Sequence, residues 1–481
     1  MKKKWLQIIG YTLLIASIAF IAVLIYLGYA ASKQYALQPW HEAPKWEDRL
    51  IQDKADFASY LAEERALIDS ICADVLVEET STYNRYGKNN PSSPYWNGEN
   101  GNASFEYRPQ DGEIMGGILL VHGLSDSPYH LRAIGKLFAD NGYYVIGLRL
   151  PGHGTVPGAL LNVQWEDWYD AVKFGAQMVQ SEISSLADKR FYVGGFSTGG
   201  ALTLRYVLQS LSDTTALIPD QLLLLSPAIG VHPLAEASDW HKLTSWMFEE
   251  FKWFEIKPEY DPFKYNSFPK NAIDQIFELT IANRKLMDKL AKKTGVLEKM
   301  PPIYASQSCV DATVETQKLI DLFVQLAPPK SDLYLFDVNR KFEAAMPDKL
   351  SLAKIVDYEQ IKSSPATVVM VTNKQMEGTP GYGNKISFRP LTKASEAKAL
   401  QLEQDDALSA LEWPENLFAL SHVCIPIASD DYFYGDESKL GKINAKGENN
   451  VLLLGNDLHR LRYNPFYDLI EKSIMQSFVE Q

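Results

Sequence analysis

The chain has 481 residues, of which 46% are hydrophobic and 22% charged, a composition typical of globular proteins and not of disordered or fibrous ones. Its 60 acidic and 47 basic side chains give a formal net charge of −13. This charge repels phosphate backbones and argues against a nucleic-acid partner. The three cysteines, Cys72, Cys309 and Cys424, are too few for a disulfide scaffold and wrongly spaced for a zinc site.

The N-terminal residues 1–31 are predicted to form a single-pass transmembrane anchor. Lysines at positions 2–4 precede an uncharged run over 5–30. As a helix this run would span about 39 Å, more than the roughly 30 Å core of a bilayer. The lysines predict a cytoplasmic N-terminus, with the rest of the chain on the extracytoplasmic side, periplasmic or extracellular. A cleaved signal peptide is the alternative, because Gly28 and Ala30 are small residues before a possible cut.

Residues 32–103 read as a separate N-terminal segment. Apolar residues recur at helical spacing up to about residue 80, and a loop rich in Asn, Ser, Pro and Gly follows. The main domain is expected to cover 104–481. There, short apolar runs alternate with helical stretches, which predicts an α/β fold with a mostly parallel sheet covered by helices on both faces. The expected strands are 117–121, 143–148, 190–193, 221–225, 303–306 and 332–337.

Two stretches interrupt this alternation. Residues 230–300 are aromatic and helical, which indicates a lid. Its aromatic side chains are expected either to roof a substrate pocket or only to pack against the body. Residues 341–415 are polar and mixed, with one strand-like run at 367–372, and they are expected to form a second insertion after a last full strand at 332–337.

The pentapeptide Gly195–Gly199 (Gly-Phe-Ser-Thr-Gly) matches the pattern G-x-S-x-G between an apolar strand and a helical run. A serine on a sharp strand-to-helix turn needs small neighbours two positions to either side, because the strained backbone crowds them. Ser197 is therefore the candidate nucleophile. The alternative is a glycine-rich turn that only packs.

A tetrahedral intermediate needs two preorganised N–H donors. The amide of Thr198 follows the nucleophile directly, and the amide of Leu124 lies in the loop after the strand that ends at Val121. These two amides form the predicted oxyanion hole. Gly123 permits the backbone to turn toward the site. His122 is expected to form structural hydrogen bonds and not to act in catalysis.

Three motifs in this order, 119–124 (Leu-Leu-Val-His-Gly-Leu), 149–154 (Arg-Leu-Pro-Gly-His-Gly) and 195–199, resemble the α/β-hydrolase superfamily. The similarity is to the branch of monoacylglycerol lipases, carboxylesterases and serine aminopeptidase-like hydrolases. The resemblance implies that the catalytic acid follows the strand after the lid. Asp311 fits that place, although it also stands where the N-cap of the next helix is expected.

The resemblance further implies a catalytic histidine after the last strand of the sheet, and two histidines fit that place. His422 lies among apolar residues, where an ionisable side chain needs a functional reason, and it is the favoured base. His459 is the alternative, although its neighbours Asp457 and Arg460 suggest a solvated ring.

These observations predict a membrane-anchored serine hydrolase that cleaves carboxylic esters, in particular lipid-like acyl esters such as acylglycerols, through an acyl-enzyme. Two alternatives stay open: a non-catalytic binding scaffold with the hydrolase fold, and a thioesterase or peptidase that uses the same triad. No metal-ligand cluster or dinucleotide-binding glycine motif occurs in the sequence, so no cofactor is expected.

Overall fold

The computed structural model describes residues 2–31, 35–44, 56–77, 83–87, 90–96, 98–110, 112–188, 190–213, 216–231, 249–309, 311, 313–337, 339–341, 358–378, 380–414, 425–435 and 462–480.

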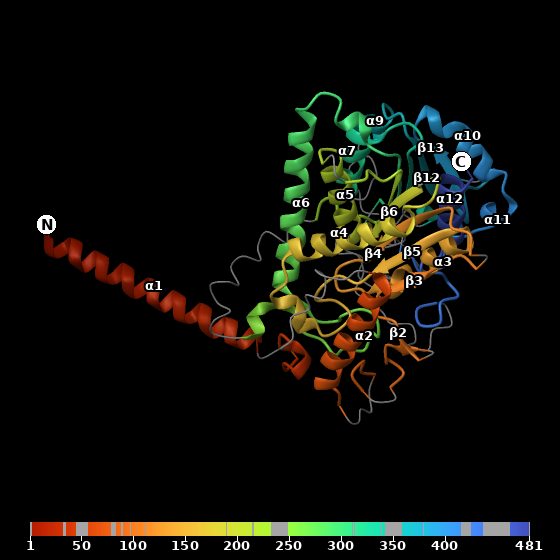
Figure 1. The fold of residues 1–481 in the computed structure, drawn as a ribbon. Helices are drawn as coiled ribbons and strands as arrows, with labels where there is room; N and C mark the ends of the chain where they lie inside the picture. Colours follow the sequence, from red (N-terminus) through yellow and green to blue (C-terminus); the bar gives the residue numbers. More distant parts are fainter. Residues whose placement is uncertain are drawn as a thin grey trace.

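A nine-stranded sheet forms the centre of the structure, in the order β13-β12-β11-β10-β7-β6-β4-β5-β3 (Figure 1). From β12 to β5 all neighbours along this order are parallel, whereas β3 and β13 pair antiparallel at the two edges. In chain order the strands are β3 (Phe105–Tyr107), β4 (Gly116–Val121), β5 (Tyr143–Leu148), β6 (Arg190–Phe196), β7 (Gln221–Leu225), β10 (Ile303–Ser308), β11 (Asp332–Phe336), β12 (Thr367–Gln375) and β13 (Tyr382–Pro390).

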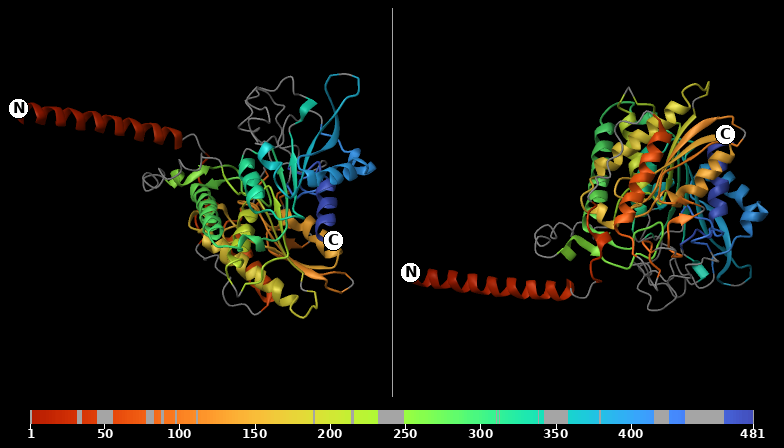
Figure 2. Two further views of the ribbon diagram at one scale, coloured as in Figure 1. Left: turned by 90° about the horizontal axis from the view of Figure 1, so that it is seen from above. Right: turned by 60° about the horizontal axis from the view of Figure 1, so that its bottom comes forward.

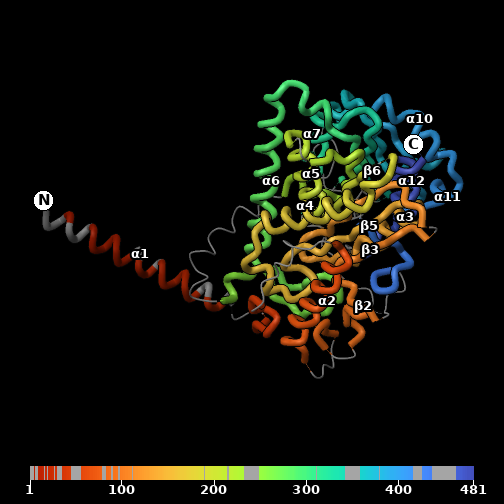
Figure 3. The backbone as a smooth tube through the Cα atoms, viewed as in Figure 1, coloured from red at the N-terminus to blue at the C-terminus, as the bar shows by residue number. Residues whose placement is uncertain are grey.

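Helices cover both faces of this sheet, as the sequence predicts. One face packs against α2 (Phe57–Asp74), α4 (Trp165–Glu182), α5 (Thr198–Ser210), α6 (Lys270–Ala291) and α7 (Thr316–Leu326). The other face packs against α3 (Arg132–Asp140), α10 (Glu396–Glu403), α11 (Asp406–Ser409) and α12 (Tyr467–Phe478). Successive strand residues alternate between the two cores: Leu119 points into the first and Leu120 into the second. The path of α6 runs beside α5 (Figure 3).

The sheet continues beyond β11, so the interpretation of 332–337 as the last strand is wrong. β12 pairs in parallel with β11, and β13 returns antiparallel to it. The six residues Val368–Asn373 of β12 are all buried, whereas β13 keeps much of its length partly exposed. A strand at a sheet edge tolerates polar side chains on its open face. The polar composition of 341–415 therefore does not distinguish an insertion from two added strands.

The N-terminal helix α1 (Lys2–Ala31) projects away from the rest of the molecule in both views of Figure 2. Its large apolar side chains, among them Trp5, Leu13, Phe20 and Tyr29, are exposed. Among the described residues, no helix combines the length and the apolar character that crossing a membrane requires. The predicted transmembrane helix is therefore not shown by the structure.

Helix α2 belongs to the same hydrophobic core as the sheet, through Phe57, Tyr60 and Leu61. Asp56 caps its N-terminus by accepting a hydrogen bond from the N–H of Ser59 at 2.8 Å. The helical pattern predicted up to residue 80 is thus realised over 57–74.

A buried ion pair joins α2 to the loop after β5. Glu64 Oε1 lies 3.0 Å from Arg149 Nε, and both side chains are at most 2% exposed. The same carboxylate accepts hydrogen bonds from the Tyr60 hydroxyl at 2.8 Å and from the Ser104 N–H at 2.6 Å. Arg149 also donates from Nη1 to the carbonyl of His153 at 2.9 Å. The Arg149–Gly154 loop is therefore held by a residue that lies far outside the hydrolase motifs.

Replacing Glu64 by glutamine should lower the free energy of unfolding by about 3–5 kcal/mol, because it leaves the buried Arg149 charge without its partner. Chemical denaturation followed by circular dichroism measures the change. The matched control is Glu99→Gln, which removes an exposed carboxylate 3.9 Å from Arg65. That control should cost less than about 1 kcal/mol. Equal effects of the two substitutions would show that the buried pair contributes no special stability.

Candidate active site

Ser197 lies on a sharp turn between β6 and α5. Its backbone has φ 53° and ψ −115°, a left-handed conformation that non-glycine residues rarely adopt. The Ser197 N–H donates to the Leu225 carbonyl at 2.9 Å, and its carbonyl accepts from the Ala228 N–H at 3.0 Å. Such strain persists only where the surrounding structure fixes it, and it is common at functional sites. The side chain is half-buried and stands at the N-terminus of α5.

The glycines of the motif are required by the space around this turn. A methyl group at Gly195 would lie 2.2 Å from the backbone of Gly199, and one at Gly199 would lie 1.9 Å from the Val121 carbonyl oxygen. Both distances are far below van der Waals contact. The spacing of G-x-S-x-G thus has the steric origin that the sequence predicts, and it packs the first turn of α5 against the end of β4.

The loop after β4 lies directly beside Ser197. A methyl group at Gly123 would be 3.2 Å from Ser197 Cβ and 2.6 Å from Oδ2 of Asp126, so only glycine fits there. The next residue is Leu124, whose amide is one predicted oxyanion donor. Thr198, the other, is the first residue of α5, where N–H groups have no partner within the helix. Both predicted donors therefore lie on segments that meet at the nucleophile.

His122 has the structural role that the sequence predicts. Its Nε2 accepts the N–H of Leu150 at 3.0 Å, so Nδ1 carries the proton that is donated to the Gly123 carbonyl at 2.8 Å. Burial, followed by the nearby His153 ring, holds the pKa of His122 well below its usual value and keeps the ring neutral. His122 thereby ties the Leu119–Leu124 loop to the Arg149–Gly154 loop.

Three residues that the sequence does not point to hold the loop after β4, which carries the predicted oxyanion donor Leu124. The buried Asp126 forms an ion pair with Lys264, and the Tyr265 N–H donates to the Ser125 carbonyl at 2.9 Å. Burial tends to raise the pKa of Asp126, but Lys264 and His130 outweigh it and hold that pKa well below its usual value. Asp126 therefore stays charged at neutral pH. Lys264 and Tyr265 lie 138 and 140 positions from their partners in the sequence, so no local sequence pattern predicts these contacts.

Replacing Asp126 by asparagine should lower kcat for ester hydrolysis by about ten- to a hundredfold with little change in KM, because a slightly misplaced oxyanion loop weakens transition-state binding. Steady-state kinetics on a soluble ester separates the two constants. The control is Asp140→Asn, which removes the exposed partner of Lys136. An Asp126→Asn enzyme with wild-type kcat would contradict the positioning role.

Asp311 follows β10, two strands from β6 in the sheet, at the same carboxyl-terminal edge as Ser197. Its Oδ1 accepts the N–H groups of Thr313 at 2.8 Å and Val314 at 3.0 Å. Val314 in turn bridges to Val231 on the segment that follows Ala228. Because α7 begins at Thr316 with Glu315 as its N-cap, Asp311 fixes the preceding turn and is not the helix cap.

A second carboxylate, Asp337, directly follows the next strand, β11, and is bound by other residues. Asp337 is buried, forms an ion pair with Arg340 and accepts the Thr372 hydroxyl at 3.0 Å. Both candidate bases, His422 and His459, lie outside the described residues, so the choice between them stays a prediction. Among the residues that the structure describes, no group of histidine, cysteine and carboxylate side chains could hold a metal ion.

The described aromatic residues of the predicted lid mostly pack against the body. Phe263 is buried and stacks on Tyr129 with ring centroids 3.7 Å apart, and Trp253 is 2% exposed. Phe254, by contrast, is 61% exposed. Trp240, Trp246 and Phe248 lie outside the described residues. For Phe263 and Trp253, packing is thus the correct interpretation.

Comparison with known proteins agrees with this geometry. Residues 112–321 match the family model of the S33 serine aminopeptidases. The matched stretch runs from β4 to β10 and contains all three motifs. This stretch is similar to that family, and the sheet with its covering helices has the α/β-hydrolase fold. Over 114 residues the chain is 32% identical to a thermostable monoacylglycerol lipase from Bacillus sp. (strain H-257), which covers 24% of this chain and 43% of that protein.

A carboxylesterase from Bacillus subtilis (strain 168) is 30% identical to the hydrolase chain over 89 residues, 18% of this chain and 34% of that protein. The matches thus span less than half the length of these curated relatives. Among solved structures, a soluble variant of monoglyceride lipase from Saccharomyces cerevisiae in complex with a substrate analogue aligns with 13% identity and a TM-score of 0.38. The alignment covers 54% of this chain and 87% of that one.

Proposed function

We propose that this hydrolase cleaves carboxylic esters through an acyl-enzyme, with Ser197 as nucleophile, His422 as general base and Asp311 as the acid that orients the imidazole. The strained backbone of Ser197 at the N-terminus of α5 is the observation that carries the proposal. A strained backbone at a serine beside a glycine loop is costly to maintain, and nucleophilic catalysis supplies the reason.

The chemistry follows from the placement of these groups. Ser197 Oγ attacks the acyl carbonyl while its proton passes to the histidine, and the negative oxygen is stabilised by the amides of Leu124 and Thr198. The histidine then protonates the leaving alcohol. Water then attacks the acyl carbonyl while losing a proton to the histidine, and the histidine passes that proton to Ser197 Oγ as the bond to the acyl group breaks and the carboxylic acid leaves.

For the substrate, we propose lipid-like acyl esters such as acylglycerols. The support is the similarity of the domain to proteins named monoacylglycerol lipase and carboxylesterase. The exposed apolar side chains of α1 are consistent with an enzyme that acts near a lipid surface.

Labelling with a fluorophosphonate probe tests the proposed function directly, because only an activated serine reacts quickly. We expect rapid labelling of the wild-type chain and none of Ser197→Ala. A panel of p-nitrophenyl esters and monoacylglycerols of increasing chain length then ranks the substrates. A folded wild-type protein that neither reacts with the probe nor hydrolyses any ester would favour a non-catalytic scaffold.

We also propose that α1 holds the enzyme at a membrane, with the catalytic domain on the extracytoplasmic side. A chain that starts near Ser32 should move from the membrane fraction to the soluble fraction and keep its kcat/KM for short soluble esters. Fractionation and steady-state kinetics on the two proteins measure this. A truncated protein that still sediments with membranes would place the attachment elsewhere in the chain.

A further inference from the structure

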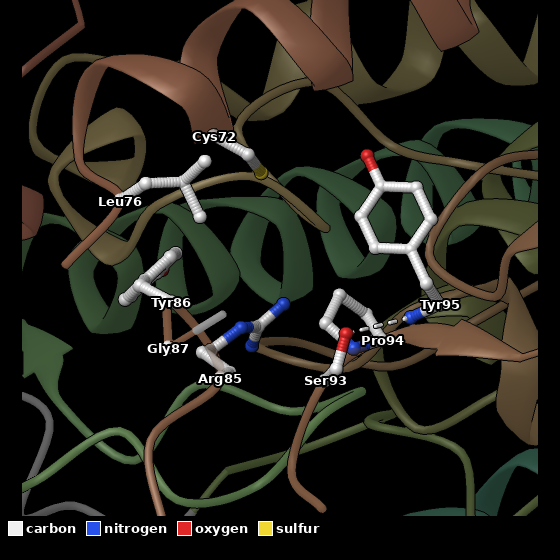
Figure 4. A pocket seen from close by; sticks show the side chains of 8 residues that line it. All are labelled: Cys72, Leu76, Arg85, Tyr86, Gly87, Ser93, Pro94 and Tyr95. Carbon is white, nitrogen blue, oxygen red and sulfur yellow. Dashed lines mark hydrogen bonds between the residues drawn. The ribbon is translucent and has the colours of Figure 1, made fainter. Parts of the chain in front are cut away.

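A cavity of about 290 Å³ is lined by residues of the N-terminal segment, and Ser197 is not among its lining residues (Figure 4). Its walls come from the end of α2 and from the loops around residues 85–87 and 93–95. The lining residues are Cys72, Leu76, Arg85, Tyr86, Gly87, Ser93, Pro94 and Tyr95. This volume is at the lower end of the range for small-molecule sites, so a ligand would be small.

Arg85 is a buried cation in the wall of this cavity. It is 4% exposed, and within the described part of the chain its Nε and Nη1 atoms have no hydrogen-bond partner. Its guanidinium carbon lies 5.6 Å from the ring centroid of Tyr86 and 5.1 Å from that of Tyr265. These contacts cover the faces of the group and leave N–H donors at its edge unmatched. A buried charge whose Nε and Nη1 atoms lack hydrogen bonds is costly, so an anion that reached the guanidinium would be stabilised there.

The two carboxylates near Arg85, those of Glu259 and Asp69, form hydrogen bonds with other residues. Glu259 accepts the N–H groups of Asn266 at 2.9 Å and Ser267 at 2.7 Å, and Asp69 accepts the hydroxyl of Tyr95. Neither forms an ion pair with Arg85 in the described part of the chain. Their negative charge nonetheless disfavours a multiply charged ligand beside Arg85.

We propose that this cavity binds a small organic carboxylate, with the carboxylate on the guanidinium of Arg85 and the apolar part against Leu76, Tyr86 and Pro94. A guanidinium fork matches a carboxylate in geometry and charge. The Ser93 hydroxyl, which accepts the Tyr95 N–H at 3.3 Å, retains a proton that it can donate to the anion. Figure 4 shows the Arg85 side chain extending between Cys72 and Ser93.

The other groups in the wall are compatible with an anion. Burial raises the pKa of the Cys72 thiol to about 11, so the thiol is neutral at pH 7 and adds no negative charge. The apolar portions of the wall distinguish an organic acid from inorganic phosphate. The proposal does not depend on the hydrolytic activity.

Ligand-dependent thermal unfolding of the full chain in detergent tests the proposal, with hexanoate as probe and hexanamide and inorganic phosphate as comparisons. We expect hexanoate to raise the unfolding temperature in a saturable way, and hexanamide and phosphate to have little effect. Arg85→Met should weaken hexanoate binding by about ten- to a hundredfold, since it removes a charge-assisted hydrogen bond.

Because Arg85→Met can fail to fold, Leu76→Trp provides a second variant. Leu76 is 46% exposed, so a larger side chain there should fill the cavity without disturbing the core and should abolish the hexanoate effect. The matched control is Leu217→Trp, at a leucine that is 44% exposed and outside the cavity lining. No stabilisation by hexanoate, equal stabilisation by hexanamide or phosphate, or unchanged hexanoate binding in Leu76→Trp would each overturn the proposal.

Discussion

Ser197→Ala should lower ester turnover by about 10³- to 10⁶-fold, the range found when a triad member is removed. The substitution deletes only Oγ, and the alanine Cβ occupies the place of the serine Cβ. The unfolding temperature should therefore stay close to that of the wild type. Single-turnover and steady-state assays on a short soluble ester, with calorimetry of both proteins, measure the two quantities.

A second serine with a similar backbone offers a matched control for this variant. Ser226, at the end of β7, is buried with φ 40°, so Ser226→Ala removes a hydroxyl from a comparably strained residue. It should keep most of the activity. Near-normal turnover in Ser197→Ala, or an equal loss in Ser226→Ala, would contradict the assignment of Ser197 as the nucleophile.

Replacing His422 by alanine should remove activity to a degree comparable with Ser197→Ala, about 10⁴-fold or more, because the triad residues act as one unit. It should also slow fluorophosphonate labelling, since without a base the serine hydroxyl is weakly nucleophilic. His459→Ala, with the same chemical change, should cost only a few-fold. Kinetics and labelling time courses on both variants decide between them.

The opposite pattern would identify His459 as the base and would leave His422 a packing residue. Losses in neither variant would reject both assignments. The base would then have to be sought among the other histidines of the chain, such as His130, which lies 4.0 Å from Asp126.

The parts of the fold that local sequence encodes could be predicted. The strands β4, β5, β6 and β7 are short apolar runs bounded by turn residues, and Gly195 and Gly199 are required by backbone contacts a few positions away. Hydrophobic periodicity and the steric requirement for glycine involve residues that are close together in the sequence. Both are therefore visible as local sequence patterns.

The contacts that complete the site could not be predicted, because they join residues far apart in the chain. Asp126 and Lys264 each look like an ordinary surface charge, and only the tertiary fold brings them into one ion pair. β13 was missed because a half-exposed edge strand has no continuous apolar run.

The Glu64–Arg149 pair has a consequence for where this protein can be cut. A polypeptide reduced to residues 112–321 would retain Arg149 and lose both the carboxylate of Glu64 and the hydroxyl of Ser104, which accepts the Arg149 N–H at 2.8 Å. It would also uncover the sheet face that Phe57, Tyr60 and Leu61 close. We therefore expect that the stretch that carries the family motifs does not fold on its own, and that a minimal expressible protein must begin before α2, at or ahead of Asp56.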